Sequence, residues 1–329
     1  MPTLPMSSCN PPLERAPLRP NFWTPQPEHF AAREQKLLND FNSAYITERF
    51  GNLRFAIRNF ADNAPWNATT VSKSFVFRAH VQQTLDTHQY PYKEIELARL
   101  ALLCTRLSNA TSRGSALYAL LSWIMIANIS LHGSPQYTLL PPGLLSITTQ
   151  LRSRTFDEFS YWAWEKTRVY LCHLLCPTDP LKVLREDLKQ PLPNPPAEDH
   201  LLGLLRDLLG PFLTLHDDES DALRRCVRIA TRFGLALQCD LRPWGLSFCF
   251  AHTVPSPGGL REPAQVLPFE RESLWKFDTE DRKDLVTEKE VTLFPALLAL
   301  GDDSGRRHEV PIVIVAAQVG SWKELMKPR

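Results

Sequence analysis

The sequence predicts an α+β protein, with a predominantly helical body and a small antiparallel β element towards the C-terminus. Two patterns lead to this fold class. Apolar residues recur at helical spacing through most of the chain up to Pro243, whereas β-rich segments follow only after it. With 329 residues, of which 43% are hydrophobic, the chain can build a substantial core in one large domain or two.

A third observation concerns the centre of the helical body. The 38 residues between Arg113 and Arg152 include no Asp, Glu, Lys or Arg, although 22% of the whole chain is charged. The densest part, Ser115–Leu131, is shorter than the roughly 20 apolar residues that a membrane span requires, and a His-Gly-Ser-Pro cluster ends it. We therefore expect a core helix here rather than a membrane contact. A loop broken by Pro141-Pro142 and a second buried turn of helix are expected to follow within Leu139–Leu151.

The remaining helices are expected where apolar residues follow the 3.6-residue period. A Gly51-Asn52 break is expected to separate the first two, and Cys176-Pro177 to end the aromatic-rich fifth. The predicted spans are Glu28–Phe50, Leu53–Asp62, Thr70–Leu85, Tyr92–Leu107, Phe156–Cys176, Ala197–Leu213 and Glu219–Leu241.

Proline-rich segments suggest how the chain is divided. Residues 1–25 contain seven prolines and predict a disordered arm, and residues 26–190 form the helical body. Residues 191–196 contain four prolines and predict a linker. Residues 197–329 then carry further helices and a β-meander, which either pack with the body as one unit or form a separate one.

The β element is expected to contain about three strands, because a lone hairpin is marginally stable in water. Gly245–His252 alternates in polarity, and Val291–Leu300 and Val310–Val319 flank a connection rich in Asp and Gly. Pro295 cannot donate a hydrogen bond to a neighbouring strand, so it predicts an edge strand or a bulge within Val291–Leu300.

The sharpest local pattern is a row of arginines on the predicted helix Glu219–Leu241. Arg224, Arg228 and Arg232 follow at i, i+4 and i+8, with Arg225 beside them, opposite an apolar stripe. Such a row can bind phosphate, an acidic partner or a nucleic-acid backbone. The alternative is an ordinary solvated helix face, with Asp221 as the pairing carboxylate.

Other candidate sites have simpler structural interpretations. Cys172 and Cys176 have a spacing that can chelate a metal, but no second Cys/His pair completes a zinc site, so core cysteines are favoured. His216-Asp217-Asp218 precedes a strong helix and is expected to cap it. Asp302–Gly305 is expected to form a turn rather than a Ca²⁺ site. The sequence predicts no metal, no cofactor and no identifiable catalytic residue.

The composition of the chain also indicates where in the cell the protein is located and which kind of partner it binds. The N-terminus lacks a secretory signal pattern, and the seven irregularly spaced cysteines are typical of reduced thiols, which predicts a cytoplasmic or nuclear protein. The net charge of +1 provides no overall field to attract nucleic acid or a membrane surface. A protein partner is therefore the expected kind of partner.

Three segments carry a resemblance to a group of known proteins. They are Leu117–Leu131 with the following Tyr137–Pro142, the capped arginine helix, and the ending Leu293–Val319. Together they resemble uncharacterised helical proteins of filamentous fungi, which place a helical body before a C-terminal pair of strands. The resemblance implies an intracellular fungal protein and transfers no catalytic residue.

The leading hypothesis is a non-enzymatic intracellular protein with an interaction or regulatory role. One alternative is an enzyme or accessory protein of fungal specialised metabolism, with an apolar pocket lined by Trp123, Trp162 and Trp164. Core packing of these tryptophans is the simpler interpretation. Another alternative is nucleic-acid or phosphate binding through the arginine row.

Overall fold

The computed structural model describes residues 42–67, 74–131, 134–152, 158–176, 192–248, 290–302, 307–315 and 317–321. The predicted arm over residues 1–25 and most of the first predicted helix lie outside these ranges. The same is true of most of the predicted Asp302–Gly305 turn.

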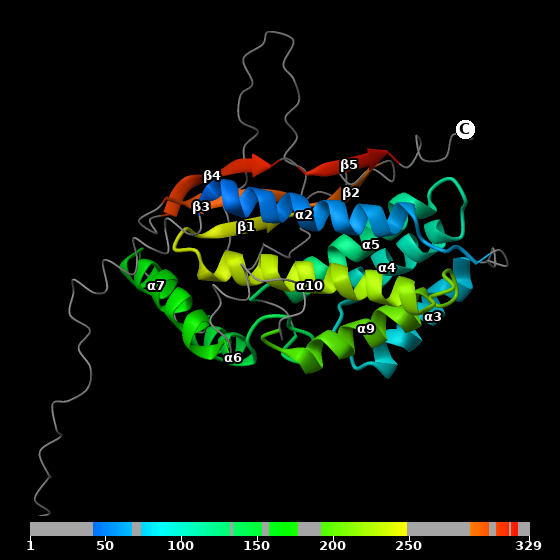
Figure 1. Cartoon of the computed structure of the whole chain (residues 1–329), viewed down its shortest axis with the longest axis horizontal. Helices are drawn as coiled ribbons and strands as arrows, with labels where there is room; N and C mark the ends of the chain where they lie inside the picture. The colour runs from blue at the N-terminus through cyan, green and yellow to red at the C-terminus, as the bar shows by residue number, and fades with distance from the viewer. Residues whose placement is uncertain are drawn as a thin grey trace, which may run out of the picture.

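Within the described ranges the fold is α+β, as predicted, with eight helices and five strands. The strands gather on one side of the helical body, and the helices make up the rest (Figure 1). The helices are α2 (Ser43–Asp62), α3 (Ser74–Thr87), α4 (Glu94–Leu107), α5 (Arg113–Asn128), α6 (Pro142–Arg152), α7 (Glu158–Leu175), α9 (Pro195–Leu209) and α10 (Asp217–Cys239). The strands are β1 (Trp244–Ser247), β2 (Glu290–Phe294), β3 (Ala296–Gly301), β4 (Arg307–Val315) and β5 (Gln318–Ser321).

Helix α2 corrects one sequence prediction. It runs without interruption through Gly51, where a break was expected. Asn42 caps the helix, because its Oδ1 accepts a hydrogen bond from the Tyr45 backbone N–H at 2.8 Å. Gly51 has no neighbour within 4 Å of where a Cβ would lie. A single glycine costs a helix only about 1 kcal/mol, so the apolar stripe of α2, which packs on the core, outweighs it.

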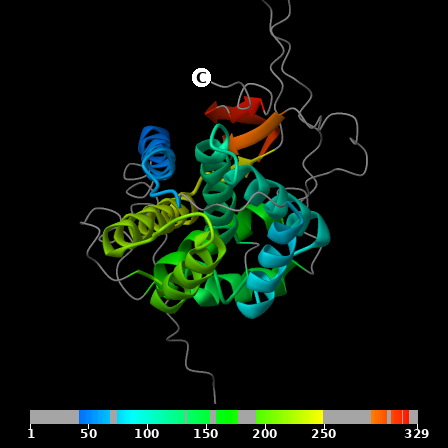
Figure 2. The same ribbon diagram turned by 90° about the vertical axis from the view of Figure 1, so that its right-hand side faces the viewer.

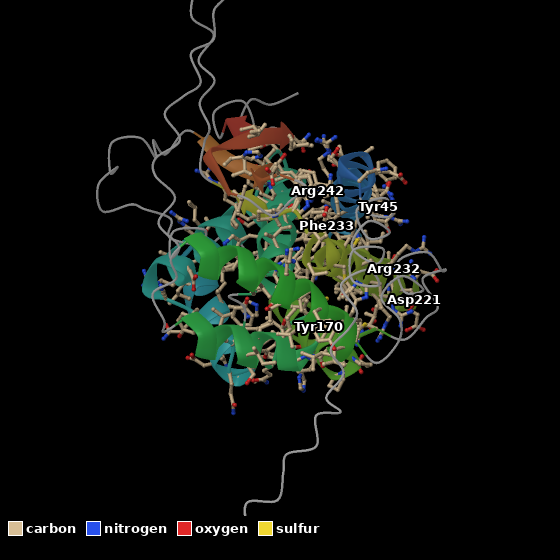
Figure 3. The ribbon with its side chains drawn as sticks, turned by 90° about the vertical axis from the view of Figure 1, so that its left-hand side faces the viewer. Tyr45, Tyr170, Asp221, Arg232, Phe233 and Arg242 are labelled. Carbon is tan, nitrogen blue, oxygen red and sulfur yellow. The ribbon has the colours of Figure 1, made fainter. Side chains whose placement is uncertain are left out.

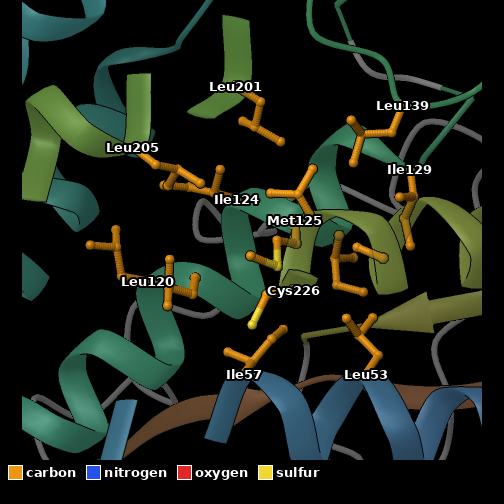
Figure 4. Close-up of a cluster of buried hydrophobic side chains, with 14 of the residues drawn as sticks. Leu53, Ile57, Leu120, Ile124, Met125, Ile129, Leu139, Leu201, Leu205 and Cys226 are labelled. Carbon is orange, nitrogen blue, oxygen red and sulfur yellow. The ribbon is translucent and has the colours of Figure 1, made fainter. Parts of the chain in front are cut away.

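Helix α5 is the centre of the core, as the uncharged stretch predicted. Eleven of its 16 residues are buried, and it contacts β2, α2, α4 and α10. Figure 2 shows it directly beneath the strands. Leu120, Ile124 and Met125 meet Ile57 of α2 and Cys226 of α10 in this core (Figure 4). None of the described helices combines the length and apolarity required to cross a membrane.

The strands form two small antiparallel sheets. One has three strands in the order β1-β3-β4, and the other pairs β2 with β5. Pro295 separates β2 from β3, so the predicted strand Val291–Leu300 is in fact two strands in different sheets. The prediction of an edge strand or a bulge holds in part: β2 belongs to a two-stranded sheet, and the pairing register shifts in both β2 and β3. Strand β3, however, is central in its sheet and buried along its whole length. A break at proline is the cause, because proline cannot extend a hydrogen-bonded ladder.

One hydrophobic core spans the predicted linker. Buried residues before it, such as Leu121, and after it, such as Leu205 and Phe233, belong to the same cluster. Within residues 191–196, Leu192 and Asn194 are buried, and Asn194 Nδ2 donates to the Thr138 carbonyl at 2.8 Å. Pro195 and Pro196 occupy the first turn of α9, where a missing N–H costs nothing.

Candidate functional site

The predicted arginine row lies on α10, and the start of that helix follows its sequence prediction. His216 occupies the N-cap position, and its backbone N–H donates to Glu219 at 3.2 Å. Asp217, Asp218 and Glu219 fill the first turn, where the helix dipole favours negative charge. The capping interpretation of His216-Asp217-Asp218 is therefore confirmed. The predicted apolar stripe is also buried, at Leu223, Cys226, Val227, Ala230, Phe233 and Leu237.

Two members of the arginine row converge on one carboxylate. Arg224 Nη1 and Arg228 Nε lie 3.1 and 3.0 Å from the same oxygen, Glu198 Oε1. Glu198 comes from the first turn of α9, and only 5% of its side chain is exposed. Arg224 also reaches the exposed Asp199 at 3.3 Å. The sequence had suggested Asp221 as the pairing carboxylate, but the ion pairs between α9 and α10 are made by Glu198 and Asp199.

The other two arginines lie in different surroundings. Arg225 is exposed, whereas Arg232 is buried near Tyr45 of α2 (Figure 3). The Arg49 guanidinium lies 4.9 Å from the centre of the Tyr45 ring. Burial raises the pKa of Tyr45, and the nearby Arg49 and Arg232 charges oppose this rise. The row is thus divided between an interhelical ion pair, an exposed position and a buried position whose charge acts on Tyr45 of α2.

Replacing Glu198 with glutamine tests the ion pair. We expect the free energy of unfolding to fall by about 1–3 kcal/mol, because two half-buried guanidinium groups lose their shared counter-charge. Urea unfolding followed by circular dichroism measures the loss.

Asp199→Asn is the matched control for that variant. Its side chain is 68% exposed and lies 3.3 Å from the same arginine. A loss below about 0.5 kcal/mol is expected for it. Equal losses for the two variants would contradict the assignment of Glu198 as the shared partner.

A second polar centre holds the C-terminal end of α10. Arg168 of α7 is buried, and its guanidinium donates to three backbone carbonyls. These carbonyls belong to Leu237, Gln238 and Asp240, at 3.1, 2.6 and 2.8 Å respectively. The last carbonyls of a helix lack partners within the helix, so Arg168 satisfies groups that burial would otherwise leave unpaired.

The Asp240 side chain continues this centre into β1. Its carboxylate accepts hydrogen bonds from the Arg242 guanidinium, the shortest 2.9 Å, and from Trp244 Nε1 at 2.8 Å. Burial raises the pKa of Asp240, while Arg242 and Trp244 oppose the rise. These hydrogen bonds join residues of three elements, so we interpret the centre as a structural link between α7, α10 and β1.

A third polar cluster joins α3, α9 and the turn after α5. His88 Nε2 lies 2.6 Å from Asp207 Oδ2, and the Tyr137 hydroxyl donates to the His88 backbone carbonyl. Burial raises the pKa of both Tyr137 and Tyr90, which lie edge to face. A histidine held by a carboxylate can act as a general base. In the described part of the chain, however, the Tyr137 hydroxyl bonds to the His88 backbone carbonyl and not to the His88 ring, whose hydrogen-bond partner is Asp207.

The remaining candidates are mostly core residues. Cys172 and Cys176 are buried, as predicted for core cysteines. Across the described residues, no three His, Cys, Asp or Glu side chains gather closely enough to hold a metal ion. Trp123 packs partly buried against the core, whereas the Trp162 and Trp164 side chains lie outside the described part of the structure. The hypothesis of a tryptophan-lined pocket therefore stays a prediction.

Comparisons of the chain with known proteins found no relative. No family model, curated protein or solved structure matches the chain. The resemblance to helical proteins of filamentous fungi therefore remains a prediction, and a functional proposal has to be argued from the chain's own residues.

Proposed function

We propose that this protein is a non-enzymatic interaction protein that binds an extended, uncharged segment of a partner protein along strand β4. The observation that carries the proposal is a run of three exposed apolar side chains. Ile312, Val313 and Ile314 are 49%, 39% and 39% exposed. The neighbouring strand β3 is buried throughout, so the exposure is confined to the outer strand.

The position of β4 in its sheet supports this mode of binding. It is the last strand in the order β1-β3-β4, and among the described residues no strand pairs with its outer side. A strand at the edge of a sheet presents backbone N–H and C=O groups that an extended peptide can use, with alternate side chains setting specificity. Pro311 has no N–H to offer, which places the usable edge at residues 312–315.

The chemistry of the edge limits the partner. Residues 310–317, Val-Pro-Ile-Val-Ile-Val-Ala-Ala, contain no charged side chain. A charged partner strand would lose hydration against these residues without gaining a counter-charge, whereas an apolar strand would bury surface favourably. The edge therefore suits a β-branched, uncharged segment.

The test is a fluorescence-anisotropy titration of the full chain with a labelled peptide of alternating valine and threonine. We expect saturable binding to this peptide and none to a matched peptide with a central proline, which cannot pair as a strand. Ile314→Lys is expected to weaken binding by about tenfold or more, since it places a charge in the apolar contact.

Phe55→Lys is the matched control, because Phe55 is also an exposed apolar residue but lies on α2. It should bind the peptide as the wild type does. The proposal fails if the wild type binds neither peptide, or if folded Ile314→Lys binds as tightly as the wild type. A dimer in sedimentation that Ile314→Lys dissociates would assign the edge to a second copy and overturn the proposed partner.

A further inference from the structure

Two buried thiols meet where α7 packs against α10. The Sγ atoms of Cys172 and Cys239 lie 3.4 Å apart, and neither side chain is exposed. Cys172 is one helical turn after Arg168, whose guanidinium binds the end of α10. We call the hydrogen bonds from Arg168 to the end of α10 the Arg168 clamp. Because it positions the end of α10, it also holds Cys239 against Cys172.

The two sulfur atoms are in direct non-bonded contact. A disulfide has a sulfur–sulfur distance of about 2.05 Å, so the two atoms need to approach by about 1.4 Å. The Arg168 charge favours the thiolate form of Cys239, although burial outweighs it and raises the pKa of that thiol. A thiolate is the reactive form of cysteine, so reaction is expected to be slow and to pass through brief local opening of the interface.

We propose that Cys172 and Cys239 are an oxidation site, at which a peroxide oxidant converts the two thiols into a disulfide that links α7 to α10. One thiolate attacks hydrogen peroxide, forming a sulfenic acid and releasing hydroxide. The second thiol attacks that sulfur and displaces its oxygen as water. In total, two thiols and one peroxide give one disulfide and two waters, and the electrons of the two sulfurs reduce the peroxide.

Burial raises the thiol pKa of other cysteines as it does that of Cys239, so the feature that distinguishes this pair is the 3.4 Å sulfur–sulfur contact. Cys104 on α4 is fully buried, and burial raises the pKa of its thiol to about 12. Cys226 donates to the Ala56 carbonyl at 3.5 Å, and burial likewise raises its thiol pKa to about 12. Cys176, one turn beyond Cys172, also acts electrostatically on Cys239 and is the competing partner in the α7 helix.

The test treats the full-length native protein with hydrogen peroxide, alkylates the remaining thiols, and maps linked peptides by mass spectrometry. We expect a Cys172–Cys239 peptide that dithiothreitol removes. The linkage should raise the Tm by roughly 5 °C or more, because it closes a long loop in the unfolded chain. Recovery of a Cys176–Cys239 linkage instead, or of sulfinic acid without any linkage, would overturn the proposal.

Two variants separate the linkage from general effects of oxidation. Cys239→Ala should lose both the linked peptide and the oxidation-dependent rise in Tm, whereas Cys104→Ala should keep both. If Cys239→Ala does not fold, the peptide map of the wild type decides alone. A peroxide-dependent rise in Tm of similar size in folded Cys239→Ala would also overturn the proposal.

Discussion

Replacing Arg168 with methionine is expected to lower the free energy of unfolding by about 3–5 kcal/mol, the largest effect that we predict for a single side chain. Methionine retains much of the side-chain length but removes all the donors. The carbonyls of Leu237, Gln238 and Asp240 would then lose this donor at a buried helix end. Each buried polar group left unpaired costs about 1–3 kcal/mol. Urea unfolding monitored by circular dichroism measures the change.

Arg58→Met is the matched control for the Arg168 variant. Arg58 pairs with Asp62 at 3.2 Å on the surface of α2, where both side chains are largely exposed. Exposed pairs of this kind contribute about 0.2–1 kcal/mol, so only a small loss is expected. If Arg168→Met proved as stable as Arg58→Met, the end of α10 would not depend on the clamp from α7.

Replacing Gly234 with alanine should destabilise the protein by about 2–3 kcal/mol, although alanine is the better helix former. Gly234 lies in α10 where that helix crosses the end of α5. A Cβ at this position would lie 2.6 Å from Ile129 Cβ and 2.9 Å from Ile129 Cγ2. Both atoms belong to a β-branched residue with little rotamer freedom, so the helices must move apart. A fall in Tm of several degrees, measured by calorimetry, is expected.

Gly51→Ala provides the control with the same substitution in another helix interior. Because nothing lies within 4 Å of its new Cβ, this variant should gain up to about 1 kcal/mol from helix propensity alone. The two alanines should therefore shift stability in opposite directions. A gain at both positions would show that α5 and α10 are not in tight contact at Gly234.

Much of the fold could be predicted from local patterns. The lack of charge between Arg113 and Arg152 predicted the buried helix α5, and the apolar stripe of α10 predicted which of its faces packs inward. Two predictions relied on a rule about a single residue type, and the tertiary structure corrects both. Gly51 was expected to break a helix, but burial of the α2 stripe against α10 and α5 outweighs its small cost. Pro295 was expected to mark one irregular strand, but it separates two.

The candidate sites were harder to predict than the fold, because they depend on contacts between residues that are distant in the sequence. The arginine row was evident in the sequence, but Glu198, which precedes Arg224 by 26 positions, showed no sign of being its partner. Such pairs cannot be recognised in the sequence, because the two residues are far apart in the chain and meet only when their helices pack together.

Periodicity and composition are properties of neighbouring residues, so the chain alone was sufficient to indicate the fold class, the central helix and the inward face of α10. The Arg168 clamp, the Glu198 ion pair and the Cys172–Cys239 contact join residues up to 72 positions apart. They exist because helix packing fixes a few atoms within 2.6–3.4 Å of each other. At these distances hydrogen bonding and thiol chemistry become possible, and only the packed tertiary structure decides which side chains take part.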